Sequence, residues 1–363
     1  MSHFSLLADP AAYTVSDANL LADAAAREYW TNLFEAHFAQ VLDAAKVAYG
    51  RSVGRQAELA RQQFAQALAS LKADPASLGP RLGVVELCRL REQALRDNGL
   101  HDPFRPVKAR ENKAAAALYA PLVKHLAAVP LERRWELLVR GVFAGNIFDL
   151  GSAATMGYAT DAVDFEAVLA KIKPRPWLID HLDRLLEMLP VAGDQPTVWA
   201  KCIFFVDNAG ADFVLGVMPL ARQMAAQGTH IVLAANELPS LNDLTADETV
   251  QLVQMLGNQD EELATYVEAG LFEVVSTGND IPLIDLSNVS DELNQAAEDA
   301  DLVILEGMGR SVESNLHTKL IVDQIQLCLL KDPSVAARVQ GQLFDCVCLY
   351  RPYDEDQPPP AQE

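Results

Sequence analysis

A carboxylate and a carboxamide stand side by side at the end of an apolar stretch, in the sequence FFVDNAGAD from Phe204 to Asp212. The run Cys202 to Val206 is continuously apolar, which is typical of a strand buried on both faces of a parallel sheet. Open α/β sheets bind ligands at the carboxyl ends of their strands. Asp207 and Asn208 are therefore candidates for a ligand-binding site.

A second polar strand end follows the next apolar run, Ile231 to Ala235. The loop after it carries Asp243 and leads to a helix for which Thr245 is the expected N-cap. Oxygen atoms of Asp207, Asn208 and Asp243 would form a hard site suited to Mg²⁺, Mn²⁺ or a similar divalent ion. Asp and Asn are also common at such turns because they cap helices, so the residues alone leave both interpretations open.

A third strand end is predicted after Leu302 to Leu305, where the sequence reads Glu306-Gly307-Met308-Gly309-Arg310. Gly307 and Gly309 would let backbone N–H groups approach an anion, and the Arg310 guanidinium can bind phosphate oxygens with two donors. The alternative is that Gly-x-Gly marks only a tight turn.

Three further polar residues are candidates for the same site. Asn146 lies in the stretch Gly145 to Asp149, which we expect to interrupt a helix, and it can either reach into the site or cap a helix end. Asp212 can orient Asn208, act as a base, or only stabilise the start of a helix. Lys319, on a predicted amphipathic helix, can bind phosphate, although exposed helical lysines usually have no such role.

The apolar pattern changes near residue 190. Before it, apolar residues recur at helical spacing; after it, strand-like runs alternate with helical stretches, which is typical of βαβ units with right-handed crossovers. We therefore expect a helical domain over residues 1–190 and an α/β domain over residues 191–355. The tail 356–363, rich in proline and polar groups, is expected to be disordered. The predicted strands are Cys202–Val206, His230–Ala234, Phe272–Val275, Leu302–Leu305 and Phe344–Leu349.

The composition argues against several classes of partner. Lys plus Arg number 29 against 50 Asp plus Glu, which gives a net charge of −21. That charge repels nucleic acid and anionic lipid, and no basic stripe offsets it. No run of 18 or more apolar residues and no signal peptide pattern occurs, so we expect no membrane association. The five cysteines form no C-x-x-C pair, which favours buried thiols and a cytoplasmic location.

Four motifs carry a family resemblance: AGNIFDLGS, VDNAGAD, AANELPSLNDLT and EGMGR. Together they resemble the metal-dependent damage-control phosphatases, also called domain-of-unknown-function family 89 or ARMT-like proteins, over about His101 to Tyr350. The most similar subgroup stands alone in plants and is fused to a pantothenate-kinase-like domain in animals. The resemblance implies a metal held by Asp207, Asn208 and Asp243. It also implies a helical N-terminal part packed on a Rossmann-like, three-layer α/β/α domain with a mainly parallel sheet.

One more segment is similar to the family. Asp102-Pro103-Phe104-Arg105 is followed by Lys108, Glu111 and Asn112. For Arg105 the alternative, a solvated basic face, is favoured.

The resemblance implies an enzyme that hydrolyses the phosphomonoester of a small metabolite with Mg, Mn, Co or Ni as cofactor. In the mechanism we expect, the metal polarises the phosphoryl oxygens and lowers the pKa of a water, while Arg310 stabilises the developing charge. An attack by Asp207 itself is the alternative, disfavoured because the D-x-D nucleophile motif is absent. The subgroup implies 4′-phosphopantetheine or its oxidised, damaged forms as substrate, and the wider family implies sugar phosphates.

Two functions of other classes remain as alternatives. One is an S-adenosylmethionine-dependent carboxyl methyltransferase. The first strand is not followed by the G-x-G turn that such cofactors need, which argues against this function. The other is a non-catalytic metabolite-binding module. The three metal-ligand positions are all occupied by suitable residues, which argues against this function.

Overall fold

The computed structural model describes residues 1–147, 169, 171–192 and 195–354. Within these residues, seven strands form one sheet in the order β1-β7-β6-β5-β2-β3-β4. All neighbouring strands are parallel except β6 and β7, which are antiparallel. The expected mainly parallel sheet is confirmed. The strands are β1 Ile179–Asp180, β2 Lys201–Phe205, β3 His230–Ala235, β4 Phe272–Ser276, β5 Leu302–Glu306, β6 Asp323–Leu329 and β7 Cys346–Arg351.

Three strands differ from the expectation. β6 was not predicted, because Gln324 and Gln326 interrupt its apolar pattern; both are buried, and Gln326 donates through Nε2 to the Asn315 carbonyl oxygen at 2.8 Å. β7 begins at Cys346 and not at Phe344, which has a φ of 65° that no strand residue adopts. The two residues of β1 were not predicted either.

Helices cover both faces of the sheet, as expected for three layers. Side chains of β2 alternate between the faces: Cys202 and Phe204 lie in a core with α5, α8, α9 and α10, whereas Ile203 and Phe205 lie in a core with α11. The helices are α1 Ala24–Tyr49, α2 Gly54–Ala73, α3 Val84–Asp97, α4 Arg105–Ala127, α5 Leu131–Ile147, α7 Leu182–Leu186, α8 Met218–Ala226, α9 Ala246–Gly257, α10 Glu261–Glu268, α11 Asp291–Ala296 and α12 Pro333–Arg338. The short segments are the 3₁₀ helix η1 Arg51–Val53 and the π-helices η2 Asp212–Val217 and η3 Gly309–Glu313.

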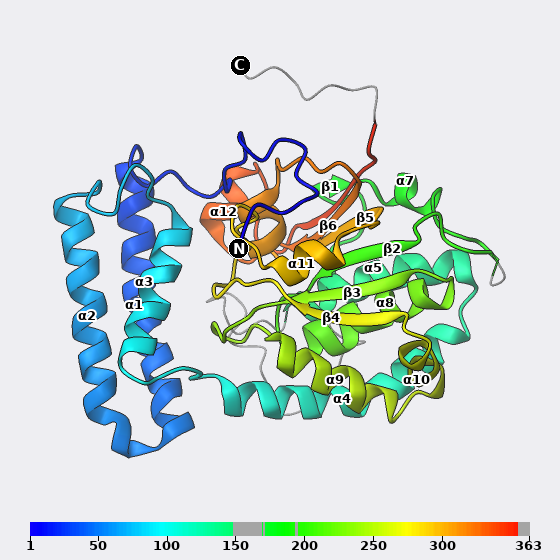
Figure 1. The fold of residues 1–363 in the computed structure, drawn as a ribbon, viewed down its shortest axis with the longest axis horizontal. Coiled ribbons are helices and arrows are strands. Elements are labelled where there is room, and N and C mark those ends of the chain that lie inside the picture. Colours follow the sequence, from blue (N-terminus) through cyan, green and yellow to red (C-terminus); the bar gives the residue numbers. More distant parts are fainter. Residues whose placement is uncertain (148–168, 170, 193–194, 355–363) are drawn as a thin grey trace.

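The change of composition near residue 190 is not a boundary in the packing. Trp135 and Phe143 of α5 share one core with Phe204 of the sheet, so α5 belongs to the α/β layers. Helices α1, α2 and α3 form the helical part that stands beside the sheet (Figure 1). The predicted disordered tail lies outside the described residues.

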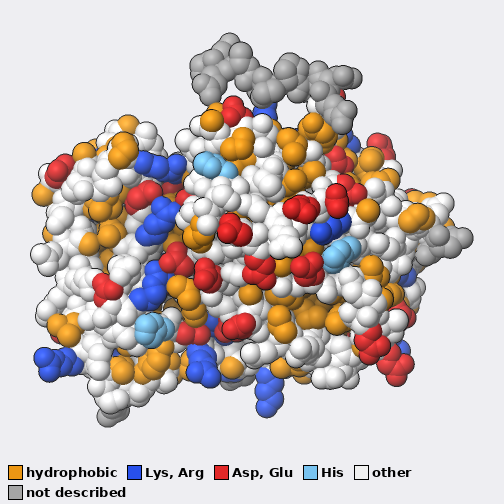
Figure 2. All heavy atoms as spheres, in the orientation of Figure 1, with side chains coloured by type: hydrophobic (Ala, Val, Ile, Leu, Met, Phe, Trp, Pro, Cys, Tyr) orange, Lys and Arg blue, Asp and Glu red, His pale blue; other side chains and the backbone are white. Residues whose placement is uncertain are grey.

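Polar contacts join α3 to the loop after β4. Arg89 pairs with Asp285 at 2.7 Å and Arg96 pairs with Asp280 at 2.6 Å. Figure 2 shows basic side chains interspersed with acidic ones on this face of the molecule. Among the described residues, no helix is long and apolar enough to cross a membrane.

Candidate active site

Three strand ends meet at one edge of the sheet. β2 pairs with β3 on one side and with β5 on the other, so the residues that follow these three strands are neighbours in space. Asp207 follows β2, Asp243 lies on the loop after β3, and Arg310 lies in η3 after β5. Their side chains are buried, with exposed fractions of 5%, 2% and 1%.

The loop after β3 folds back onto the loop after β2. Asn208 and Asp243 form an antiparallel backbone bridge, and the Leu244 N–H donates to the Asp207 carbonyl oxygen at 3.1 Å. The helix that follows, α9, starts at Thr245 as N-cap, as expected. The structure thus brings the three predicted metal ligands together.

Arg310 lies between the two predicted carboxylate ligands. Its guanidinium pairs with Asp207, and its Nη2 donates to Asp243 Oδ2 at 2.9 Å and to Asn236 Oδ1 at 3.2 Å. The sequence predicted a phosphate ligand here, whereas in the structure Arg310 neutralises the two carboxylates. A cation at this place shows that the carboxylates attract positive charge.

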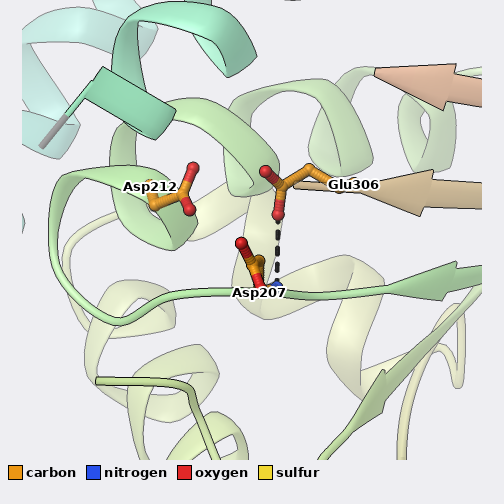
Figure 3. A group of neighbouring side chains, drawn as sticks. All are labelled: Asp207, Asp212 and Glu306. Carbon is orange, nitrogen blue, oxygen red and sulfur yellow. Dashed lines mark hydrogen bonds between the residues drawn. The ribbon is translucent and has the colours of Figure 1, made fainter. Parts of the chain in front are cut away.

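Asp207 also belongs to a second cluster of acidic side chains, together with Asp212 and Glu306. One carboxylate oxygen from each of Asp207, Asp212 and Glu306 lies within 4.8 Å of the others, and the three side chains converge in Figure 3. Glu306 is fully buried, and its Oε2 accepts a hydrogen bond from the Asp207 backbone N–H at 3.2 Å. Glu306 was not predicted as a site residue, although Glu306 ends β5 and Asp207 similarly follows β2.

Asn146 and Asn208 connect the acidic groups. Asn146 Nδ2 donates to Asp212 Oδ2 at 3.1 Å and to Glu306 Oε1 at 3.0 Å, so Asn146 does reach the site. Asn208 Nδ2 donates to Asp207 Oδ2 at 2.8 Å and to Asp212 Oδ2 at 2.9 Å. Asp212 therefore accepts hydrogen bonds from both amide side chains. The expected helix interruption near Asn146 is absent up to Ile147, where α5 ends; Phe148 and Asp149 lie outside the described residues.

The two glycines after β5 permit close backbone packing. Gly307 has a φ of 88°, and a Cβ atom there would collide with the Asp207 carboxylate. A Cβ atom on Gly309 would lie 2.6 Å from the Pro282 carbonyl oxygen. The Gly307 N–H donates to the Leu327 carbonyl oxygen at 3.0 Å, which corrects the expectation that it would be available to an anion.

A cavity of about 540 Å³ opens beside the strand ends. Asp207, Asn208 and Asp243 line it, together with residues of α1 and α3. Four lining residues to which the sequence patterns gave no role are polar and buried: Arg91, Asn242, Glu313 and Lys331. Lys331 follows β6, which was not predicted, and Arg91 could have been found as a charged residue on the apolar face of its helix.

Lys319 does not belong to this group. It is exposed, it does not line the cavity, and it lies in an irregular segment where an amphipathic helix was expected. The turn at Asn315 to Thr318 ends the preceding helical segment early, so that the chain can enter β6.

The segment that follows Asp102 contacts the backbone of the two loops that carry the predicted metal ligands. Lys108 is 1% exposed, pairs with Glu248 at 2.7 Å and donates to the Asp243 carbonyl oxygen at 3.5 Å. Asn112 Oδ1 accepts from the Gly210 N–H at 2.6 Å. Arg105 is exposed, which agrees with the solvated alternative.

The residues at the strand ends fit a divalent metal ion. Carboxylate and amide oxygens are hard donors of the kind that Mg²⁺ and Mn²⁺ prefer. Asn242, 1% exposed and next to Asp243, has neither side-chain polar atom hydrogen-bonded to a described residue. Buried polar atoms are rarely left without a partner in folded proteins, so this side chain is available to a ligand in the cavity.

Comparison with known proteins decides the family. A model of the damage-control phosphatase ARMT1-like domain matches residues 32–347. The chain belongs to this family. It is therefore a phosphatase, and the resemblance inferred from the four motifs is confirmed.

Individual relatives agree with this assignment. A damage-control phosphatase of Arabidopsis thaliana is 42% identical over 294 residues, which are 80% of this chain and 78% of that protein. The 4′-phosphopantetheine phosphatase of Mus musculus is 29% identical over 95% of this chain and 48% of its own length, so this chain spans about half of the mouse protein. A solved structure of a DUF89 family protein from Pyrococcus horikoshii has a TM-score of 0.61, with 20% identity, over 89% of this chain and 97% of that one. That similarity supports the fold.

Proposed function

We propose that this chain is a divalent-metal-dependent phosphomonoester hydrolase that acts on 4′-phosphopantetheine or its oxidised, damaged forms. The observation that carries the proposal is the cluster of Asp207, Asn208 and Asp243 in the wall of a cavity of about 540 Å³. A cavity of this size accommodates a small organic ligand and not only a phosphate group. The substrate assignment is supported by the name of the mouse relative.

Asp207, Asn208 and Asp243 would hold the metal ion. When bound, the ion would supply polarisation of the phosphoryl oxygens and a lowered pKa of water. Asp212 and Glu306 already accept hydrogen bonds from Asn146, so in our proposal they hold Asn208 and Asp207 in orientation and do not bind the ion themselves. Partners of this kind are often required for metal affinity.

Arg310 and Asn242 would bind the phosphoryl group. Arg310 is directed at the two carboxylates, where a metal ion would compete with it for negative charge. A guanidinium displaced in this way lies next to the place where the phosphate oxygens would bind. The Asn242 amide, which has no other partner among the described residues, can donate to the same group.

A water molecule is the nucleophile that we favour over Asp207. The Asp207 carboxylate is a predicted metal ligand and accepts a hydrogen bond from Asn208, and both contacts would reduce its reactivity. Borohydride reduction during turnover distinguishes the two, because it converts an aspartyl phosphate to homoserine. If homoserine is found in place of Asp207, then Asp207 attacks the phosphorus and the water mechanism is wrong.

The proposal is tested with a panel of phosphate esters after chelator treatment of the protein. 4′-phosphopantetheine, its oxidised forms and sugar phosphates are each assayed with Mg²⁺, Mn²⁺, Co²⁺ and Ni²⁺. We expect hydrolysis with at least one metal, preference for the pantetheine esters, and loss of activity in Asp243→Ala. Preference for sugar phosphates would overturn the substrate, and full activity in Asp243→Ala would overturn the metal site.

A cytoplasmic location is also part of the proposal. All five cysteines are buried and unpaired, which is typical of proteins in a reducing compartment. Nucleic acid is not an expected partner because of the net charge of −21.

A further inference from the structure

Glu313 is a buried carboxyl group in the wall of the cavity that has no role in the site described above. It is the last residue of η3, it is 5% exposed, and it lines the same cavity as Asp207. Its Oε1 atom has no hydrogen-bond partner among the described residues. Leaving a buried polar atom without a partner costs free energy, and a bound ligand could remove that cost.

Much of the cavity wall is apolar. Helix α1 contributes Trp30, Leu33 and Phe34, and Leu283 and Met308 add to this apolar lining. Such a wall suits an uncharged organic chain, and a small number of polar groups then fix its position. Glu313 is one of the few acidic groups that line the cavity away from the predicted metal ligands.

We infer that Glu313 is a specificity-determining residue whose carboxyl group donates a hydrogen bond to an uncharged oxygen, such as an amide carbonyl, in the tail of the phosphomonoester. The inference rests on the proposed function, because it takes the phosphate group to bind beside Asp207 and Asp243. The tail then extends along the apolar wall to Glu313. The substrate class is a phosphomonoester with an uncharged tail that contains an amide.

The surroundings of Glu313 favour the protonated form that can donate. Burial raises the pKa of this carboxyl group to about 8. Arg338 of α12 lowers the pKa, but its Nη2 donates to the Glu313 backbone carbonyl oxygen, at 3.1 Å. The other ionisable groups near Glu313, or in the same cavity wall, are Asp17, Tyr29, His37, Cys88, Arg91, Asp207, Asp243, Lys331 and Asp332.

The test compares two phosphate esters of equal length, one of an N-acylated aminopropanol and one of a plain alkanol. In Glu313→Leu we expect KM for the amide ester to rise about three- to tenfold, because one hydrogen bond to the substrate is lost. We expect kcat for the amide ester, and KM for the alkyl ester, to stay unchanged. In Glu313→Gln the side-chain amide still donates, so the preference for the amide ester should persist. Between pH 7 and 9, KM for the amide ester should rise in the wild type and stay level in Glu313→Gln.

Controls separate a structural effect from a loss of specificity. The thermal midpoint and kcat on the alkyl ester show whether Glu313→Leu is folded; if it is not, the pH profile of Glu313→Gln decides. Equal changes in KM for both esters, or a wild-type KM that does not depend on pH, would overturn the role of Glu313. A wild-type protein that hydrolyses no ester with any metal would refute the proposed function instead.

Discussion

Arg310 is the residue in which the predicted site and the structure differ most. It was expected to bind phosphate, and it pairs with the carboxylates of Asp207 and Asp243. The expectation and the observed ion pairs agree if a metal ion and the Arg310 guanidinium compete for the same negative charge. The arrangement also explains how two buried carboxylates can coexist, since unpaired buried charges are strongly unfavourable.

Replacing Arg310 therefore has two opposite effects. In Arg310→Ala we expect kcat/KM to fall about 100-fold, because a charge-stabilising donor is lost, while affinity for the divalent ion rises. Isothermal titration with metal in the absence of substrate measures the second effect. Arg310→Lys is the matched control, because it keeps the charge and loses the paired donors. A parallel fall in metal affinity would show that Arg310 only holds the ligands in place.

Glu313 makes stability depend on pH. Its pKa, raised by burial to about 8 from 4.5, means that the folded chain binds the proton more tightly than the unfolded chain. Stability should therefore fall as pH rises from about 4.5 to about 8. Glu313→Gln cannot lose a proton, so its free energy of unfolding should exceed that of the wild type more at pH 8.5 than at pH 5. Denaturant unfolding at the two pH values measures the difference, and an equal difference at both would contradict the expectation.

At the scale of elements, the contact between α5 and η2 positions the acidic groups. A Cβ atom on Gly145 would lie 2.9 Å from both the Ala211 carbonyl oxygen and Asp212 Cα. This close approach places Asn146 within hydrogen-bonding distance of Asp212 and Glu306. The π-helix η2 has the irregular geometry that is frequent at functional sites.

Adding one methyl group at Gly145 should disturb this contact. Because the obstructing atoms are backbone atoms, we expect Gly145→Ala to cost about 1–3 kcal/mol of stability and to lower kcat. Gly54→Ala is the control: Gly54 begins α2, nothing lies within 4 Å of its added Cβ, and its replacement should be neutral or slightly stabilising. Urea unfolding and phosphatase assays on both variants measure this. Equal stability and equal kcat of the two variants would mean that the close contact between α5 and η2 is not required for folding or activity.

For the whole molecule, metal binding and folding should be linked. The predicted ligands come from two loops that converge only in the folded chain, so the ion binds the folded state preferentially. At a metal concentration 100 times Kd, we expect stabilisation of about 2.7 kcal/mol. Thermal unfolding with and without metal measures it, and Asp243→Ala should not respond. A similar rise in that variant would place the metal elsewhere.

Local residue patterns were enough to predict the alternation of strands and helices after residue 190 and the motifs at three strand ends. These features are local: an apolar run followed by Asp207 or Glu306 is visible in a few consecutive residues. Polar residues inside a buried strand, such as Gln324 and Gln326, conceal it, and so β6 and the following Lys331 were missed.

Which residues meet in the site follows from the packing of distant segments. Arg91, Asn242 and Glu313 lie far apart in the sequence, and they line one cavity because α1, α3 and η3 pack beside the end of the sheet. The same packing assigned α5 to the sheet layers and left Lys319 outside the site. Contacts between distant segments depend on how whole elements pack, which local patterns of residue types do not encode.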